Sequence, residues 1–162
     1  MAMESLADLL KHELGDLLYA EKTILKTSKR LAREVKDPEL LARMQQHDAE
    51  TEQQIQNIEH AFETIGERAK AEKCPGILGL VEEHDEFKKE EEPTKPMLEA
   101  FDLGTALRVE HYEIAAYHTA IAIAKAMGNR ECVAALSANL AQEVEMEKFL
   151  RANAVKALKR LA

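Results

Sequence analysis

The chain has 162 residues, enough for one domain with its own core, and 46% of them are hydrophobic while 32% are charged. Its formal net charge of −8 disfavours nucleic acid and anionic membranes as partners, because both are negatively charged. Abundant Ala, Leu, Glu and Lys with only six Gly and four Pro favour helices, so we expect an all-α single domain over residues 1–162.

Two further classes of protein are disfavoured by the same composition. No apolar run approaches the roughly 20 residues that span a bilayer, and residues 1–4 lack the features of a secretory signal. We therefore expect a cytoplasmic protein with no membrane partner. Cys74 and Cys132 match no zinc-finger spacing, which predicts two ordinary packed or half-exposed thiols.

The first half of the chain predicts a helical hairpin. A capping pair, Ser5 and Asp8, begins a helix whose apolar spacing continues to about residue 34. The second helix has Asp37 as its N-cap and Pro38 in its first turn, and it ends at Gly66. Because the turn between them is short, the two helices should be antiparallel.

The second half predicts another hairpin after a long crossover. The crossover covers residues 68–95 and carries a short amphipathic helix over residues 77–92. A third long helix runs from about Pro96 to Gly128, and Asn129 caps a fourth that continues to the C-terminus. Two antiparallel hairpins joined by one long crossover predict a ferritin-like four-helix bundle.

The apolar stripe of every long helix is interrupted by acidic residues or histidine. One buried carboxylate without a partner is costly, so several that face one another need cations between them. The predicted metal ligands in these stripe positions are Glu21, His47, Glu50, Glu110, Glu113, Glu143 and Glu147.

These positions lie at similar distances from the hairpin turns and are therefore expected at one level along the bundle axis. Glu21 lies 15 residues before the turn at Lys36 and Glu50 lies 14 after it. Glu113 and Glu143 each lie about 15 residues from the second turn. The equal depths predict a dinuclear site between the two hairpins.

The predicted ligand set is rich in oxygen and has at most one nitrogen, that of His47. Such donors suit two divalent ions, with iron or manganese favoured and zinc as the alternative. The Glu-x-x-His pattern of ferritins and rubrerythrins is absent, and only the reversed His47-x-x-Glu50 is present.

Several segments resemble the YciE/YciF-type proteins of bacteria, which are ferritin-like and associated with stress. The similar segments are residues 16–22, 47–51 and 109–117 together with Glu143, and the stretch EHYEIAAY at residues 110–117 is the most specific. The resemblance covers nearly the whole chain. It implies a ferritin-like fold, a homodimer and a metal site at the positions named above.

Three functions fit these residues. The first is redox chemistry at a pair of iron or manganese ions, such as oxidation of Fe(II) or consumption of peroxide. The second is a stress-associated structural or binding protein whose metal, such as zinc, only stabilises the fold. The third is a metal-free helical dimer in which protons and basic side chains satisfy the glutamates.

Overall fold

Four long helices and one shorter helix make up the fold. The computed structural model describes residues 3–162, and within that range it contains no strand, which confirms the all-α prediction. The helices are α1 (Leu6–Leu31), α2 (Pro38–Thr64), α3 (Pro75–Glu90), α4 (Lys95–Ala126) and α5 (Arg130–Leu161).

The helix starts follow the predicted caps. Ser5 and Asp8 form a complete capping box at the start of α1. The Asp37 carboxylate accepts hydrogen bonds from the first backbone amides of α2, and the Asn129 side chain accepts one from the amide of Cys132. Gly66, beyond the end of α2, has a φ of +72°, a conformation that glycine adopts without strain.

Some predicted helix boundaries differ from the observed ones. Helix α1 ends at Leu31 and not near residue 34, because the next amides, of Arg33 and Glu34, bond to carbonyls three residues back in a tighter turn. The crossover helix occupies Pro75–Glu90, two residues earlier at each end than predicted. Glu92 stops it with a φ of +43°, which no α-helical residue adopts.

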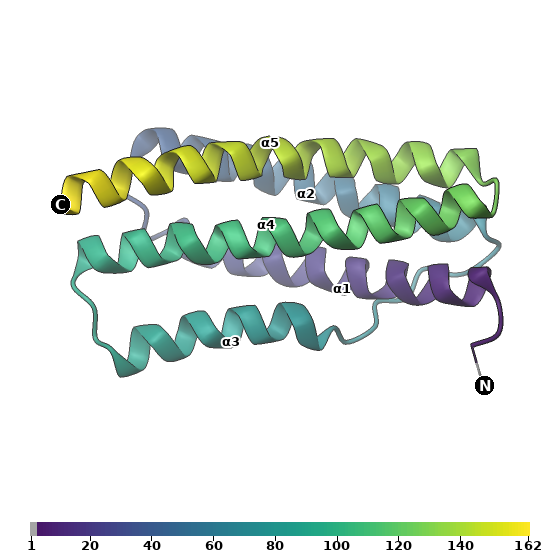
Figure 1. Cartoon of the computed structure of the whole chain (residues 1–162), viewed down its shortest axis with the longest axis horizontal. Coiled ribbons are helices and arrows are strands. Elements are labelled where there is room, and N and C mark those ends of the chain that lie inside the picture. The colour runs from purple at the N-terminus through teal and green to yellow at the C-terminus, as the bar shows by residue number, and fades with distance from the viewer. Residues whose placement is uncertain (1–2) are drawn as a thin grey trace.

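The four long helices surround a common interior. Helix α1 packs against α2 and α4, and α5 packs against α2 and α4, so that each long helix contacts two others. Within each hairpin the two helices are antiparallel. Helices α2 and α4 run in the same direction, because α3 and its flanking loops return the chain along the outside of α4 (Figure 1). No helix in the described range is long and apolar enough to cross a membrane.

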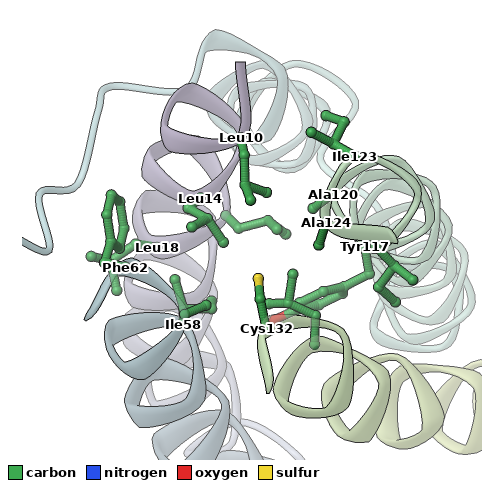
Figure 2. Packing of buried hydrophobic residues seen from close by; sticks show 14 residues of the cluster. Leu10, Leu14, Leu18, Ile58, Phe62, Tyr117, Ala120, Ile123, Ala124 and Cys132 are labelled. Carbon is green, nitrogen blue, oxygen red and sulfur yellow. The ribbon is translucent and has the colours of Figure 1, made fainter. Parts of the chain in front are cut away.

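Two apolar layers fill this interior. The larger one has Leu10, Leu14, Ile58, Phe62 and Leu136 among its fully buried members (Figure 2). The smaller one is formed by α4 and α5, with Leu103, Met146, Leu150 and Ala157 buried. In the sequence of each long helix, the acidic residues of the predicted site lie between or next to residues of these layers. The apolar packing therefore fixes their position along the bundle axis.

Helix α3 is held to the bundle by an apolar cluster around Ile77 and Ala20 and by polar contacts. The sulfur of Cys74 lies 2.8 Å from the Tyr112 hydroxyl. Buried His84 lies 2.8 Å from an oxygen of Asp102 through Nε2, and its neighbour Asp85 pairs with Arg30 of α1 at 3.0 Å. Cys74 and Cys132 are both buried free thiols.

Candidate functional site

A group of ionisable side chains is buried in the middle of the bundle. Each long helix contributes to it, because each has an acidic residue or histidine in its apolar stripe. Such residues are almost never fully buried unless they are paired. The members are Glu21, His47, Glu110, Glu113 and Glu143, all 5% exposed or less.

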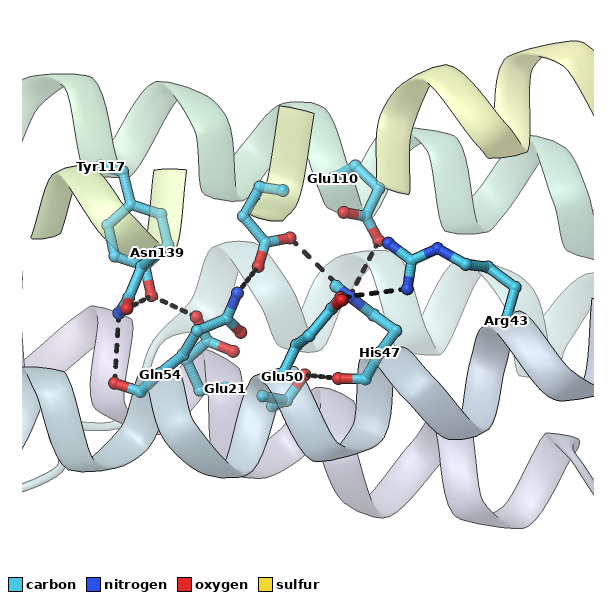
Figure 3. Close-up of polar contacts among 10 residues, drawn as sticks. Glu21, Arg43, His47, Glu50, Gln54, Glu110, Tyr117 and Asn139 are labelled. Atoms are coloured by element: carbon cyan, nitrogen blue, oxygen red, sulfur yellow. Dashed lines mark hydrogen bonds and ion pairs between the residues drawn. The ribbon is translucent and has the colours of Figure 1, made fainter. Parts of the chain in front are cut away.

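His47 lies between two of these glutamates, Glu110 and Glu143. Its Nε2 lies 3.6 Å from an oxygen of Glu110 and 3.8 Å from an oxygen of Glu143. One nitrogen or oxygen from each of the three residues lies within 4.8 Å of the others (Figure 3). These atoms come from α2, α4 and α5, so only the packed bundle brings them together.

Glu113 and Glu21, the other two members, lie near His47, Glu110 and Glu143. Burial, followed by the negative charge of Glu143, raises the pKa of Glu21 well above its usual range. Burial also raises the pKa of Glu113, and the charges of Glu21, Glu143 and Glu110 raise it further. Burial and the charge of Glu143 likewise raise the pKa of Glu110. The carboxylates therefore share one electrostatic environment.

Several carboxylate oxygens in this group have no hydrogen-bond partner. Among the described residues, nothing donates to either oxygen of Glu113, to Oε2 of Glu110 or to Oε2 of Glu143. More than nine in ten buried polar groups in proteins are hydrogen-bonded, and a buried carboxylate without a partner costs several kcal/mol. These four oxygens therefore need protons or cations.

A layer of neutral polar side chains borders the carboxylates. The Tyr117 hydroxyl donates to Glu21, and the Gln54 amide donates to Glu143. Asn139 donates through Nδ2 to the Tyr117 oxygen and to the backbone carbonyl of Gln54, at 3.1 Å in both cases (Figure 3). The layer fixes one oxygen of each bonded carboxylate, and the second oxygen of Glu143 has no hydrogen-bond partner among the described residues.

Two members of this layer, Gln54 and Asn139, are absent from the predicted site. Both are completely buried. Their spacing contains the signal: Gln54 follows His47 by seven residues, and Asn139 precedes Glu143 by four. Either step keeps a residue on one face of a helix.

Glu50 lies at the edge of the group. It contacts Nδ1 of His47 at 3.2 Å and Nη1 of Arg43 at 3.0 Å, and 17% of its side chain is exposed. Although desolvation raises its pKa, hydrogen bonds from Gln46 and His47 and the charge of Arg43 hold the pKa below its usual value. Glu50 is thus an ionised carboxylate whose charge is balanced by Arg43, and it orients His47.

Glu147 lies outside the group in this structure. It is largely buried, but its carboxylate faces Nε of Arg151 at 3.2 Å and Nε2 of exposed His111 at 3.6 Å. Tyr112 also points elsewhere, toward Cys74 at the crossover. The structure therefore brings together five of the seven predicted ligands, with Glu50 beside them and Glu147 apart.

The sequence matches a family model over nearly its whole length. The model for the "Domain of unknown function (DUF892)" covers residues 5–162, which is nearly the whole chain. The chain belongs to the DUF892 family. Protein YciF of Escherichia coli K12 is 32% identical to it over 144 residues, covering 88% of this chain and 86% of YciF.

Solved structures of DUF892-like chains have the same fold. The crystal structure of the E. coli stress protein YciF superimposes with a TM-score of 0.88 at 30% identity, covering 97% of this chain and 99% of YciF. YcfI from Rhodopseudomonas palustris, described with a proposed structural role, gives 0.87 at 34% identity over 92% of this chain and 94% of its own. The predicted resemblance to YciF-type proteins is confirmed.

Proposed function

We propose that this chain is a ferritin-like four-helix-bundle protein that binds two divalent metal ions in its interior. The observation that carries the proposal is the set of buried oxygens without partners on Glu110, Glu113 and Glu143. Cations offset the mutual repulsion of these carboxylates and satisfy the free oxygens at once. By analogy with the stress protein YciF, we place its role in the response to stress.

The donors fit a hard or borderline divalent ion. Four glutamates and one imidazole supply several oxygens and a nitrogen, a set that suits iron, manganese or zinc. We assign Glu21, Glu110, Glu113, Glu143 and His47 as ligands. When bound, iron or manganese would supply the redox chemistry needed to oxidise Fe(II) or consume peroxide.

The protein's own residues would prepare this site. Glu50 contacts Nδ1 of His47 and so leaves Nε2 directed at Glu110 and Glu143. Gln54 and Tyr117 restrain the Glu143 and Glu21 carboxylates. The ligands are at most 5% exposed, and this burial strengthens electrostatic interactions in the site.

Glu50 and Glu147 need a rearrangement before they can bind metal. Glu50 would have to leave Arg43, and Glu147 would have to leave Arg151. We therefore assign Glu50 to positioning His47 and keep Glu147 as a predicted ligand of the loaded protein only.

A second candidate is a structural protein, either with a structural metal such as zinc or without metal. Two observations favour it: the relative YcfI is described with a proposed structural role, and the raised pKa values of three glutamates allow protons to replace cations. In this candidate the site contributes stability and has no reaction.

Metal analysis separates these candidates. Protein purified without chelator is expected to contain about two ions per chain, and the Glu113→Gln/Glu143→Gln variant should contain none. The matched control is Glu63→Gln/Glu145→Gln, which makes the same change at side chains that are 76% and 68% exposed. Metal retained in the first variant, or absent from the wild type after incubation with Fe(II), Mn(II) and Zn(II), contradicts the proposal.

A second measurement separates redox chemistry from a structural metal. Iron is loaded anaerobically and peroxide is added while the absorbance is followed. A peroxide-dependent change in the wild type, absent in Glu113→Gln/Glu143→Gln, supports redox chemistry. Bound metal with no such change supports the structural candidate.

We further propose that the chain forms a homodimer. Support comes from large apolar side chains that are about half exposed at one end of the bundle, namely Met97, Val155 and Leu158. Light scattering tests this, and a monomeric mass at micromolar concentration contradicts it.

A further inference from the structure

One basic side chain is set into the bundle next to the candidate metal site. Every lysine and arginine within residues 3–162 is exposed except Arg43, whose side chain is only 13% exposed. On α2, Arg43 precedes His47 by four residues and Glu50 by seven, so the three side chains share one face of the helix. Arginine is almost never buried unless it is paired. The burial of Arg43 is therefore tied to the acidic side chains around it.

The partner of Arg43 is Glu50. Nη1 of Arg43 lies 3.0 Å from Oε2 of Glu50, and the same oxygen lies 3.2 Å from Nδ1 of His47. The other oxygen of Glu50 accepts a hydrogen bond from Gln46 at 2.7 Å. Both oxygens of Glu50 are thus engaged, whereas neither oxygen of Glu113 has a donor among the described residues.

Arg43 also lies close to the buried carboxylates. Burial and the charge of Glu143 raise the pKa of Glu110, and the positive charge of Arg43 opposes that rise. Figure 3 shows the guanidinium beside the Glu110 carboxylate. Because a guanidinium is not deprotonated in proteins, its charge is permanent. Arg43 is therefore a fixed cation at the edge of a cluster of carboxylates.

Glu50 is able to turn away from Arg43. Both residues line a surface pocket between α2 and α5, and 17% of the Glu50 side chain is exposed. Side chains that border open space change rotamer readily. Glu50 lies 14 residues after the turn at Lys36 and Glu21 lies 15 before it, so Glu50 is level with an assigned ligand. Its carboxylate can therefore reach the interior once the ion pair with Arg43 is broken.

We propose that Arg43 is a specificity-determining residue of the metal site, which competes with the metal ions for Glu50 and so limits their affinity. The proposal rests on the proposed metal-binding function and adds a residue that controls it. A guanidinium–carboxylate pair largely removed from water is a strong, charge-assisted contact, and it holds Glu50 in the role of orienting His47. Without the guanidinium, Glu50 becomes an additional ligand, and the site binds metal more tightly.

Competition titration of the chelator-treated full chain with Mn(II) against a metal-sensitive dye tests the proposal. Arg43→Gln should tighten Mn(II) binding about tenfold or more, because it frees a carboxylate and removes a positive charge. Arg43→Lys keeps the charge and should stay close to the wild type. The matched control is Arg30→Gln, which breaks an ion pair of the same 3.0 Å length on an exposed side chain and should not change Mn(II) binding.

Urea unfolding of the metal-free variants provides a readout of opposite sign. Arg43→Gln should lower the urea midpoint, because the partly buried Glu50 loses its cation. Tighter metal binding together with lower stability indicates competition, whereas a purely structural role of Arg43 would weaken both. Arg43→Met keeps the apolar stem of the side chain and should show the same pair of effects, so the test does not depend on the folding of one variant.

A double-mutant cycle with Glu50→Gln separates competition for Glu50 from simple charge repulsion. Repulsion alone gives the same gain from Arg43→Gln in both backgrounds, whereas competition makes the gain about tenfold larger when Glu50 is present. Equal gains overturn the proposal, as does unchanged or weaker Mn(II) binding by Arg43→Gln. If the wild type binds no Mn(II), Fe(II) or Zn(II), the proposed function fails; metal binding by Arg43→Gln alone then still supports competition, and binding by neither overturns both.

Discussion

Nε2 of His47 lies 3.8 Å from a carboxylate oxygen of Glu143, although 96 residues separate them in the chain. The contact joins α2 to α5, and therefore one hairpin to the other. Both residues are buried, since His47 is 5% exposed and Glu143 is completely buried. The pair marks the height at which the two hairpins must be in register.

The stability of the metal-free protein should fall as pH rises. Burial raises the pKa of Glu21, Glu110 and Glu113 above the ordinary value of 4.5, so above that pH the folded state holds more protons than the unfolded state. The contribution of these groups to the free energy of unfolding should be largest below pH 4.5. Above pH 4.5, the free energy of unfolding should fall by about 1.4 kcal/mol per pH unit for each extra proton that the folded state holds, until the pH passes the folded pKa values.

Urea unfolding between pH 5 and 9 in the presence of chelator measures this slope. Glu113→Gln/Glu143→Gln should flatten it, because the glutamine at position 113 does not titrate and the charge at position 143 that raises the pKa of Glu21 and Glu110 is gone, and Glu63→Gln/Glu145→Gln should not. Stability of the wild type that rises steadily over this range would show that the buried glutamates are charged and well paired in the folded state.

Tyr117→Phe should destabilise the protein by about 1–3 kcal/mol. The Tyr117 hydroxyl donates to Glu21 and accepts from Asn139, so its removal leaves two buried polar groups with fewer partners. Thermal unfolding measures the change. Tyr19→Phe is the control, because Tyr19 is only partly buried and lies outside the polar layer; equal losses in the two variants would assign the effect to packing.

Glu50→Gln should weaken metal binding without abolishing it. Glu50 holds Nδ1 of His47, and loss of such an orienting contact typically lowers affinity about 10- to 100-fold. Competition titration against a metal-sensitive dye measures the affinity. Exposed Glu52 on the same helix provides the control, Glu52→Gln. Complete loss of metal would make Glu50 a ligand, and wild-type affinity would remove it from the site.

Gly76→Ala should destabilise the attachment of α3. A Cβ at this position would lie 2.7 Å from a ring carbon of Tyr112, whose hydroxyl contacts Cys74. The ring must shift and lose that contact, and we expect a cost of about 1–3 kcal/mol. Gly79→Ala, on the same helix, meets no atom within 4 Å and should stabilise by roughly 0.5–1 kcal/mol through helix propensity. Thermal unfolding compares the two, and equal effects would contradict the close contact.

The helices and most of the buried acids were accessible from the sequence because they depend on local rules. Capping at Ser5, Asp37 and Asn129 and apolar spacing located the helix starts. Interrupted stripes located Glu21, His47 and Glu143 as interior residues. Gln54 and Asn139 were missed because an uncharged amide in a stripe does not stand out, although its spacing is that of the site.

The partners of each acidic side chain were not accessible in this way. Glu50 and Glu147 occupy stripe positions as suitable as that of Glu143, yet the first contacts Arg43 and the second Arg151. A difference of one helical turn, or of a side-chain rotamer, decides whether a carboxylate reaches the centre or the rim. Helical spacing does not contain that information.

The sequence by itself determined an all-α chain, its helix ends and a belt of acids in an apolar interior, because capping and periodicity act over three to seven residues. Only the tertiary structure decided which acids meet at His47 and which oxygens lack partners. These features depend on how α1, α2, α4 and α5 pack across the bundle, and contacts between distant segments arise only when the core has formed.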